Sequence, residues 1–344
     1  MNKPEVTRQA FAGPVAALLN RFNVAPVLID IGASGPHRQI WDLIALQSVL
    51  LRFDPDLREI RDLNGAGYRR AITINEAVTA DPSAGEVPFY LTRSPYCSST
   101  LEPDIEALSD YIYTDLFRVE RKVQVKASAL AAILARTKLD RVDWFKTDSQ
   151  GTDLRLFNSL PDAIRSRVLC VEVEPGILDA YRDEDKFAEA HLALMSQGFW
   201  LASAKVCGTT RIRQSTLARL RRNRPDLDVN TIRGHCDVSP GWVEALYLRD
   251  LGYLKARAAP AEDYVVLWAF ALMVDQWGYA LDVALEYEGH FGHDEASELM
   301  TTRLTEQLLR PQGGLYRQAK HALKAVLPGS VQRWIKARIV HSRA

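Results

Sequence analysis

The sequence has few cysteines, no net charge and no long hydrophobic run. Its four cysteines in 344 residues form no CxxC pair, which argues against a zinc ribbon or a disulfide framework and favours a reducing compartment. The 43 basic residues balance the 43 acidic ones, so the chain has no overall attraction for nucleic acid. The longest apolar run, Val265 to Val274, is far shorter than the roughly 20 residues that span a bilayer. The N-terminus lacks the order of a secretory signal, and we expect a cytoplasmic protein.

Apolar segments of strand length alternate with amphipathic segments as far as about residue 250. This alternation is typical of a parallel sheet covered by crossover helices. We predict seven strands, at 27–32, 49–54, 72–78, 143–148, 168–174, 199–206 and 244–250. The strand pattern then ends, and residues rich in Ala, Leu and Glu follow. The sequence therefore predicts an α/β doubly wound domain over 1–255 and a helical extension over 256–344.

The first predicted strand runs into a turn of small residues, where ligands bind in doubly wound folds. In the dinucleotide fingerprint GxGxxG, a glycine holds the position that Asp30 has here. A carboxylate repels a diphosphate but attracts the ammonium and sulfonium groups of S-adenosylmethionine. We therefore predict that the turn binds S-adenosylmethionine rather than NAD, through Asp30, Gly32, Ala33, Ser34 and Gly35.

Acidic residues also lie at the ends of the second and third predicted strands. Asp54, which precedes Pro55, lies 24 residues after Asp30, near the roughly 20-residue offset at which an acid meets ribose hydroxyls. We expect Asp54 and Pro55 to contact the cofactor ribose. Glu76 and Ala77 would offer either a carboxylate or a backbone amide to the adenine edge. The alternative for each acid is a solvated strand end or a helix N-cap.

Several sequence blocks, in order, resemble the FkbM-type family of S-adenosylmethionine-dependent methyltransferases. The resemblance covers about residues 25–250, and its most specific block is FKTDSQGTDL around Asp148. The other blocks are DIGASG, FDPD, FYLTRSPYCSSTLEPD, EVEPGILDAYRDEDKF and the Gly198-Phe199 pair. The chain departs from the family at Ser128–Ala131, where members usually have Thr-Leu-Asp, and at Asp153, where Glu is commoner.

This resemblance implies a class I methyltransferase fold, with seven strands of which the last is antiparallel. It also implies O-methyl transfer as the chemistry. Ser98 and Ser99 match a family-typical Ser-Ser pair, which implies contacts to the cofactor or the substrate. A solvated turn is the alternative for these two serines.

Methyl transfer from a sulfonium is an in-line displacement, so the protein must hold a hydroxyl near the methyl group and remove its proton. Asp148, at the end of the fourth strand, is the candidate base and a cofactor neighbour, and Gln150 shapes the turn after it. Glu174 ends the fifth strand and would share a proton or a divalent cation with Asp148, although we assign no metal. An ion-pair network with Lys146 is the alternative. His235, in a loop-like stretch, is a second candidate base, with a surface role as its alternative.

The segment Lys205–Arg233 has a net charge of +6. If its ends belong to paired strands, the connection emerges at the active-site edge. Arg219, Arg221 and Arg222 are therefore predicted to bind phosphate or carboxylate groups of an acceptor. A solvated arginine-rich helix is the alternative.

The last 29 residues contain seven Lys or Arg, no acid, and apolar residues at helical spacing. This pattern predicts peripheral contact with the inner membrane face; a flexible tail or docking on an acidic partner are the alternatives. The apolar stretch 264–285 would pack on either the sheet domain or a second subunit in a homodimer.

Taken together, these features predict a cytoplasmic S-adenosylmethionine-dependent O-methyltransferase. Its acceptor would be a hydroxyl of a sugar, glycan or small metabolite. One rival is a non-catalytic cofactor-binding or assembly protein on the same fold. The other is an NAD-dependent oxidoreductase, against which Asp30 argues.

Overall fold

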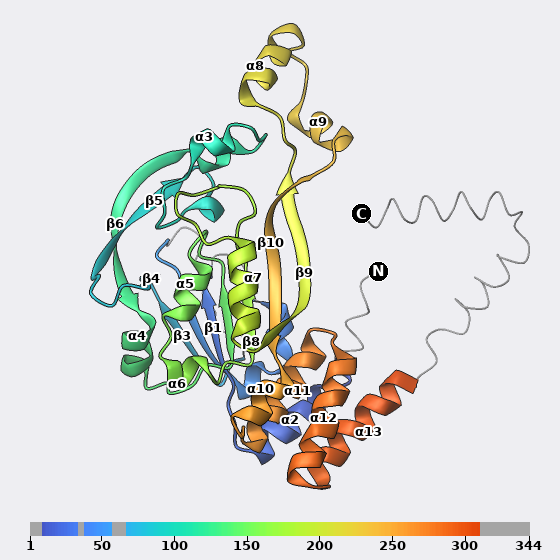
Figure 1. The fold of residues 1–344 in the computed structure, drawn as a ribbon. Helices are drawn as coiled ribbons and strands as arrows, with labels where there is room; N and C mark the ends of the chain where they lie inside the picture. The colour runs from blue at the N-terminus through green and yellow to red at the C-terminus, as the bar shows by residue number, and fades with distance from the viewer. Residues whose placement is uncertain (1–8, 34–37, 57–66, 310–344) are drawn as a thin grey trace, which may run out of the picture. The chain divides into compact units, whose positions relative to one another are not determined.

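The computed structural model describes residues 9–33, 38–56 and 67–309 (Figure 1). Its main sheet has seven strands in the order β3-β2-β1-β7-β8-β10-β9. These strands are β1 (Val27–Ile31), β2 (Val49–Phe53), β3 (Arg70–Ile74), β7 (Trp144–Thr147), β8 (Cys170–Val173), β9 (Phe199–Thr209) and β10 (Ser239–Arg249). The first five in this spatial order are parallel, whereas β10 is antiparallel to both of its neighbours. The predicted α/β class and the antiparallel last strand are confirmed, and the sheet is compatible with a Rossmann-like fold.

A second sheet, which the sequence did not predict, has three strands in the order β4-β6-β5. They are β4 (Ala77–Thr79), β5 (Glu86–Thr92) and β6 (Val119–Ala129). The single strand predicted at 72–78 is wrong, because the chain leaves the main sheet after Ile74 and enters the second sheet at Ala77. Between them, the side-chain amide of Asn75 donates to the carbonyl of Asp54 at 2.7 Å, which anchors the crossing point beside β2.

Helices cover both faces of the main sheet (Figure 1). On one face, Phe145 of β7 packs edge-on against Phe157 of α5, with ring centroids 5.4 Å apart. On the other, Trp144 contacts Trp41 of η1 at 5.9 Å and Phe270 of α11 at 5.0 Å. The helices are α2 (Ala12–Arg21), η1 (Gln39–Leu43), η2 (Ala45–Gln47), η3 (Pro95–Cys97), α3 (Ile105–Leu108), η4 (Thr114–Phe117), α4 (Leu130–Thr137), α5 (Asp153–Asn158), α6 (Asp162–Arg165), α7 (Phe187–Ser196), α8 (Gln214–Asn223), α9 (Val229–His235), α10 (Leu251–Ala256), α11 (Ala261–Met273), α12 (Trp277–Phe291) and α13 (Glu295–Leu309).

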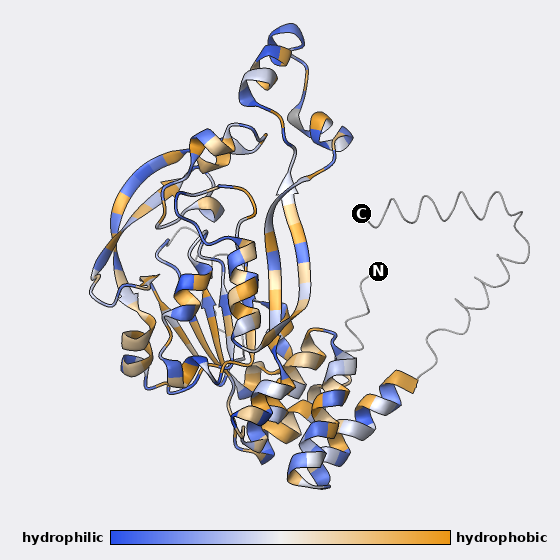
Figure 2. Cartoon of the chain, viewed as in Figure 1, coloured by the Kyte–Doolittle hydropathy of each residue, from blue (hydrophilic) through white to orange (hydrophobic). Residues whose placement is uncertain are grey.

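The longest apolar run of the sequence forms most of α11, in which every residue from Asp263 to Met273 is buried. In Figure 2 the ribbon of α8 is coloured as mostly hydrophilic residues, in contrast to the composition of α11. The helical extension was predicted to start at 256, yet α11 and α12 belong to the same compact unit as the sheet, which runs to Thr301. Of the alternatives for 264–285, packing on the sheet domain is the one observed. No helix in the described ranges is long and apolar enough to cross a membrane, and the basic tail from 316 onward lies outside them.

A buried ionic cluster fastens α11 to the amino-terminal end of the sheet. Asp263, with no exposed surface, accepts a hydrogen bond from Arg257 at 2.5 Å. It also accepts hydrogen bonds from Arg141 and Arg167, each at 3.4 Å. Three guanidinium groups from separate segments therefore share one carboxylate. Arg141 also pairs with Asp143 at 2.5 Å, so the loss of Asp263 would chiefly leave Arg257 and Arg167 without this counterion.

We predict that Asp263→Ala lowers the free energy of unfolding by about 3–5 kcal/mol, the usual cost of breaking a buried ion pair. The matched control is Asp162→Ala, since Asp162 pairs with Arg165 at 2.5 Å but its side chain is 90% exposed. That control should cost less than about 1 kcal/mol. Urea unfolding followed by circular dichroism measures both, and equal losses would contradict this role of Asp263.

Candidate active site

The turn after β1 is held by backbone contacts to both neighbouring strands. The amides of Gly32 and Ala33 both donate to the carbonyl of Phe53 at 3.0 Å. Gly32 has a φ of 71°, and a Cβ at this position would lie 2.1 Å from the carbonyl oxygen of Asp148. Only glycine fits such an approach of two backbones. Ser34 and Gly35, which the sequence also assigned to the cofactor, lie outside the described residues.

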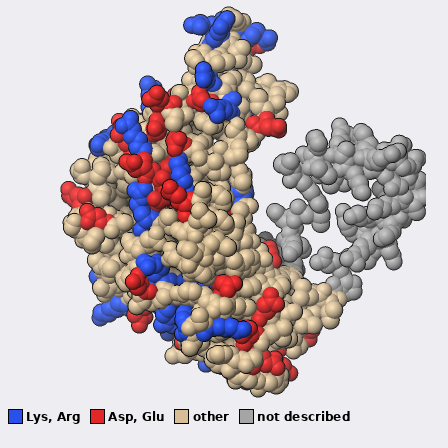
Figure 3. All heavy atoms as spheres, in the orientation of Figure 1, with Lys and Arg blue, Asp and Glu red and all other residues tan. Residues whose placement is uncertain are grey.

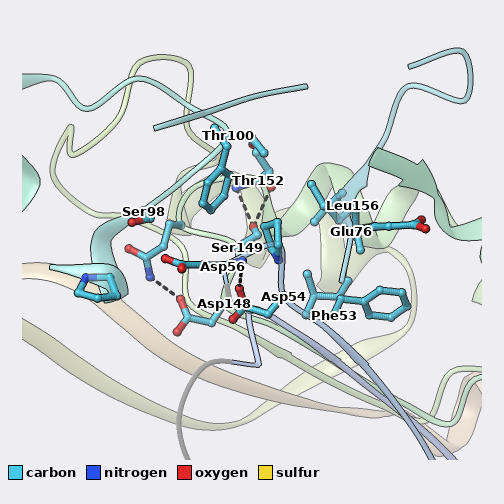
Figure 4. A pocket seen from close by; sticks show the side chains of 18 of the residues that line it. Phe53, Asp54, Asp56, Glu76, Ser98, Thr100, Asp148, Ser149, Thr152 and Leu156 are labelled. Atoms are coloured by element: carbon cyan, nitrogen blue, oxygen red, sulfur yellow. Dashed lines mark hydrogen bonds between the residues drawn. The ribbon is translucent and has the colours of Figure 1, made fainter. Parts of the chain in front are cut away.

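A first cavity opens at the carboxyl ends of β1, β2 and β7 (Figure 4). Its walls contain most of the predicted cofactor residues, namely Gly32, Asp54, Pro55, Glu76, Ala77, Ser98 and Asp148. The enclosed volume is about 70 Å³, below the roughly 300 Å³ at which small-molecule pockets begin. The described walls therefore surround only part of a nucleoside-sized ligand. Residues 34–37 and 57–66, which follow close after β1 and β2 in the chain, are outside the described ranges.

Asp54 lies in this cavity as predicted. Its side chain is almost fully buried, and burial raises its pKa to about 6 although the amide of Asp56 donates to it at 2.8 Å. Near neutral pH it is mostly a carboxylate in a poorly solvated position. Such a group gains from hydrogen-bond donors on a ligand, as ribose hydroxyls would provide.

Asp30 is not among the described residues that line the cavity. Its carboxylate accepts a hydrogen bond from Nζ of Lys146 at 2.7 Å, so a lysine already pairs with the charge that we expected to attract a cofactor cation. Burial opposes the charge on Lys146, but Asp30, Asp148 and Glu172 outweigh it and raise the lysine pKa. An ion-pair network around Lys146 was the alternative for Asp148 and Glu174, and the structure adds Asp30 to it.

Glu76 is likewise bound by other side chains of the protein. Its carboxylate is bound by Arg136 at 2.8 Å, Lys126 at 2.7 Å and the hydroxyl of Ser128 at 2.6 Å. Burial favours protonation, but these three partners prevail and lower its pKa to about 2. Figure 4 shows its side chain directed away from the cavity. We predicted that either the Glu76 carboxylate or a backbone amide would contact adenine. Because the carboxylate is already bound by three side chains, the backbone amides near Ala77 are the remaining candidates.

Gln150 adopts a left-handed conformation, with a φ of 57°, that is unusual for a residue other than glycine. Its carbonyl accepts from Ser99 Oγ at 2.8 Å, and its side-chain oxygen accepts from the hydroxyl of Tyr181 at 2.8 Å. Its side-chain nitrogen donates to Asp148. Ser99 thus supports the turn, while its neighbour Ser98 lines the cavity. Backbone strain maintained by several partners is typical of functional sites.

A second cavity of about 440 Å³ adjoins the first. Tyr96, Asp148 and Gln150 line both cavities and so form their junction. Glu174, predicted to join Asp148, lies on the wall of the second. Aromatic residues that the sequence analysis missed supply much of the remaining wall: Tyr113, Phe117, Tyr181 and Trp242. The cluster YIYTDLF was visible in the sequence, but nothing in it indicated a place beside the strand ends.

Asp148 and Glu174 are two carboxyl groups in one poorly solvated space. Burial raises the pKa of both, and the charge of Asp148 raises that of Glu174 further, while Lys146 opposes these shifts. The carboxyl of Glu174 has no hydrogen-bond partner in the part of the chain that the structure describes. The pair therefore retains a proton at pH values where two ordinary carboxyls are both ionised.

Four other predicted site residues are not brought to the cavities. His235 is exposed at the end of α9, a helix and not the expected loop, and Arg219, Arg221 and Arg222 are exposed on α8. The reason is that β9 and β10 each have 11 residues, whereas β8 has four, so their hairpin carries α8 past the sheet edge (Figures 1 and 3). Of this basic segment, Arg233 lines the second cavity instead.

No family model, no curated protein and no solved structure matches this chain. The chemistry of the site therefore bears on the function. The parts of the site are a carboxylate-lined cavity, a larger cavity with aromatic walls, and a carboxyl and an amide side chain where the two meet. In the described residues, no cluster of His, Cys, Asp and Glu is arranged to hold a metal ion.

The ion pairs of Glu76 should make the free energy of unfolding depend on pH. Because its folded pKa is lowered to about 2, it contributes stability above the ordinary glutamate pKa of about 4.3. That contribution is lost as the pH falls from about 5 towards 2. Glu76→Gln should lower the free energy of unfolding at pH 7 by about 2 kcal/mol and flatten this loss. Glu86→Gln, at an exposed position on β5, is the control; unfolding curves from pH 7 to pH 3 that superimpose for Glu76→Gln and the wild type would refute the assignment.

Proposed function

We propose that the protein is a class I S-adenosylmethionine-dependent methyltransferase that acts on a hydroxyl of a sugar, glycan or small metabolite. The observation that carries the proposal is the junction of two cavities at Asp148 and Gln150. A transfer reaction needs a donor and an acceptor that meet at one point from separate sites. The seven-stranded sheet with its antiparallel last strand supports the class I fold that the sequence resemblance implies.

The residues of the first cavity fit a cationic cofactor better than a dinucleotide. Asp54, Asp56 and Asp148 are on its walls, and none of the described lining residues is a lysine or arginine. A diphosphate would be repelled there, whereas a sulfonium and an ammonium would be attracted. Asp54 would hold the ribose, and Val78 and Leu156 offer apolar surface to the adenine. When bound, S-adenosylmethionine supplies a methyl group on a positively charged sulfur.

The chain's own contribution to the reaction is to position the acceptor and remove its proton. Asp148 accepts a hydrogen bond from the acceptor hydroxyl, and Gln150 holds the carboxylate in place from the other side. The hydroxyl proton would pass to Asp148 as the acceptor oxygen takes up the methyl group that bound S-adenosylmethionine would supply. A raised pKa makes Asp148 a better base near neutral pH than an ordinary aspartate.

Calorimetry tests the cofactor assignment. We expect S-adenosylhomocysteine to bind and NAD not to bind. Asp54→Asn should weaken S-adenosylhomocysteine at least ten-fold, since one charged hydrogen-bond acceptor contributes roughly 1.5–3 kcal/mol. Because burial raises the pKa of Asp54 to about 6, wild-type affinity should fall between pH 7.5 and pH 5, where the carboxylate is protonated. The variant should show no such fall. Binding of NAD but not of S-adenosylhomocysteine would refute the proposal.

Turnover tests the role of Asp148. With labelled S-adenosylmethionine and a screen of hydroxylated acceptors, Asp148→Asn should lower kcat by roughly 10²- to 10⁴-fold. Its affinity for S-adenosylhomocysteine should change far less. The wild-type kcat should rise with pH through the raised pKa of Asp148, since only the ionised carboxylate accepts a proton. Cofactor binding without turnover on any acceptor would instead favour the non-catalytic rival.

A further inference from the structure

Arg233 is the one basic side chain among the described residues that line the second cavity. Three other arginines of the same segment are each bound to a carboxylate. Arg211 and Arg213 bind Asp110 at 2.6 and 3.1 Å, and Arg224 binds Asp226 at 2.7 Å. For Arg233 the described part of the chain provides no carboxylate partner. Its guanidinium is thus available to a ligand in the cavity.

The charges of the second cavity are distributed unevenly. Asp148 and Glu174 follow β7 and β8, so they lie at the sheet edge. Glu184 is a third acid, but Nζ of Lys186 binds it at 2.5 Å and cancels its charge. Arg233 comes from α9 on the projecting hairpin. An anionic group would therefore be repelled at the junction and attracted at the Arg233 end.

The base of the hairpin is fixed against the cavity wall. A Cβ on Gly208 would lie 2.0 Å from the carbonyl oxygen of Ser239, so the two hairpin strands touch closely there. A β-bulge between Pro240 and Trp242 interrupts the ladder. The bulge carbonyl, that of Gly241, accepts from the amides of Ile177 at 2.7 Å and Leu178 at 3.1 Å. Bulges commonly re-aim side chains at functional sites, and this one places Trp242 on the cavity wall.

Aromatic rings form part of the wall of the second cavity. Tyr113, Phe117 and Tyr181 pack in sequence, with centroids 5.3 and 5.6 Å apart. Rings of this kind, together with carboxyl groups that accept hydrogen bonds, suit the apolar faces and hydroxyls of a sugar ring.

We propose that the acceptor is an acidic sugar, oriented with its carboxylate or phosphate on Arg233 and its reacting hydroxyl at Asp148. The inference rests on the proposed function, since it uses the same junction. The preference for acidic acceptors would come from Arg233, which lies outside the catalytic turn around Asp148. Arg233 acts as a selectivity residue and takes no part in the proton transfer.

Binding to the protein loaded with S-adenosylhomocysteine tests this proposal. The probes are glucuronate, glucose 6-phosphate, glucose and glucosamine, measured by calorimetry. The two acidic sugars should bind at least ten-fold more tightly than glucose, as expected for one charge-assisted contact. Their ranking tells a carboxylate site from a phosphate site. Arg233→Ser should remove this preference, and Arg233→Lys should keep part of it.

The matched control is Arg219→Ser, because Arg219 belongs to the same projecting segment but does not line the cavity. It should bind all four probes like the wild type. Equal losses in the two serine variants, no preference for acidic sugars, or tightest binding of glucosamine would overturn the proposal. S-adenosylhomocysteine affinity, measured alone, separates these outcomes from a failure of the proposed function. If S-adenosylhomocysteine does not bind, the four probes are measured on the protein without it, so that the preference due to Arg233 is still tested.

Discussion

The arrangement of the site depends on a row of buried charges that crosses the main sheet. The strand register places Arg52, Asp30, Lys146 and Glu172 side by side on β2, β1, β7 and β8, so their signs alternate. Lys146 donates to Asp30, and Arg38 binds Glu172 at 2.5 Å. Arg52 donates to the carbonyl of Ala33 at 2.6 Å and so holds the turn after β1. Because each buried charge needs its neighbours, a change in register would be costly.

This row also explains why acids at similar places in the sequence have different roles. Asp30 is paired with Lys146 within the row, whereas Asp54 and Asp148 follow the strands and line the first cavity. Glu76 is turned to the second sheet, where Ser128 is one of its three partners. Ser128 begins the segment that departs from the FkbM-type pattern, and here that segment supports the sheet junction.

The sequence predicted the central strands of the main sheet well, since β1, β2, β7 and β8 are largely buried and consist mainly of apolar residues. The sequence also predicted that Asp54, Asp148 and Glu174 lie at the site, because each directly follows one of these strands. It missed β6, whose exposed charges, such as those of Arg121 and Lys122, give no apolar strand signal. The aromatic wall and Arg233 were missed because tertiary packing alone brings residues 96, 113, 181, 233 and 242 together.

The proposed meeting of a methyl donor and its acceptor at Asp148 and Gln150 can be tested by a crystal structure of the protein with S-adenosylhomocysteine. We expect the ribose hydroxyls to contact Asp54 and the sulfur to face the second cavity across the junction. If S-adenosylhomocysteine binds elsewhere, or with its sulfur directed away from that cavity, donor and acceptor do not meet at Asp148 and Gln150.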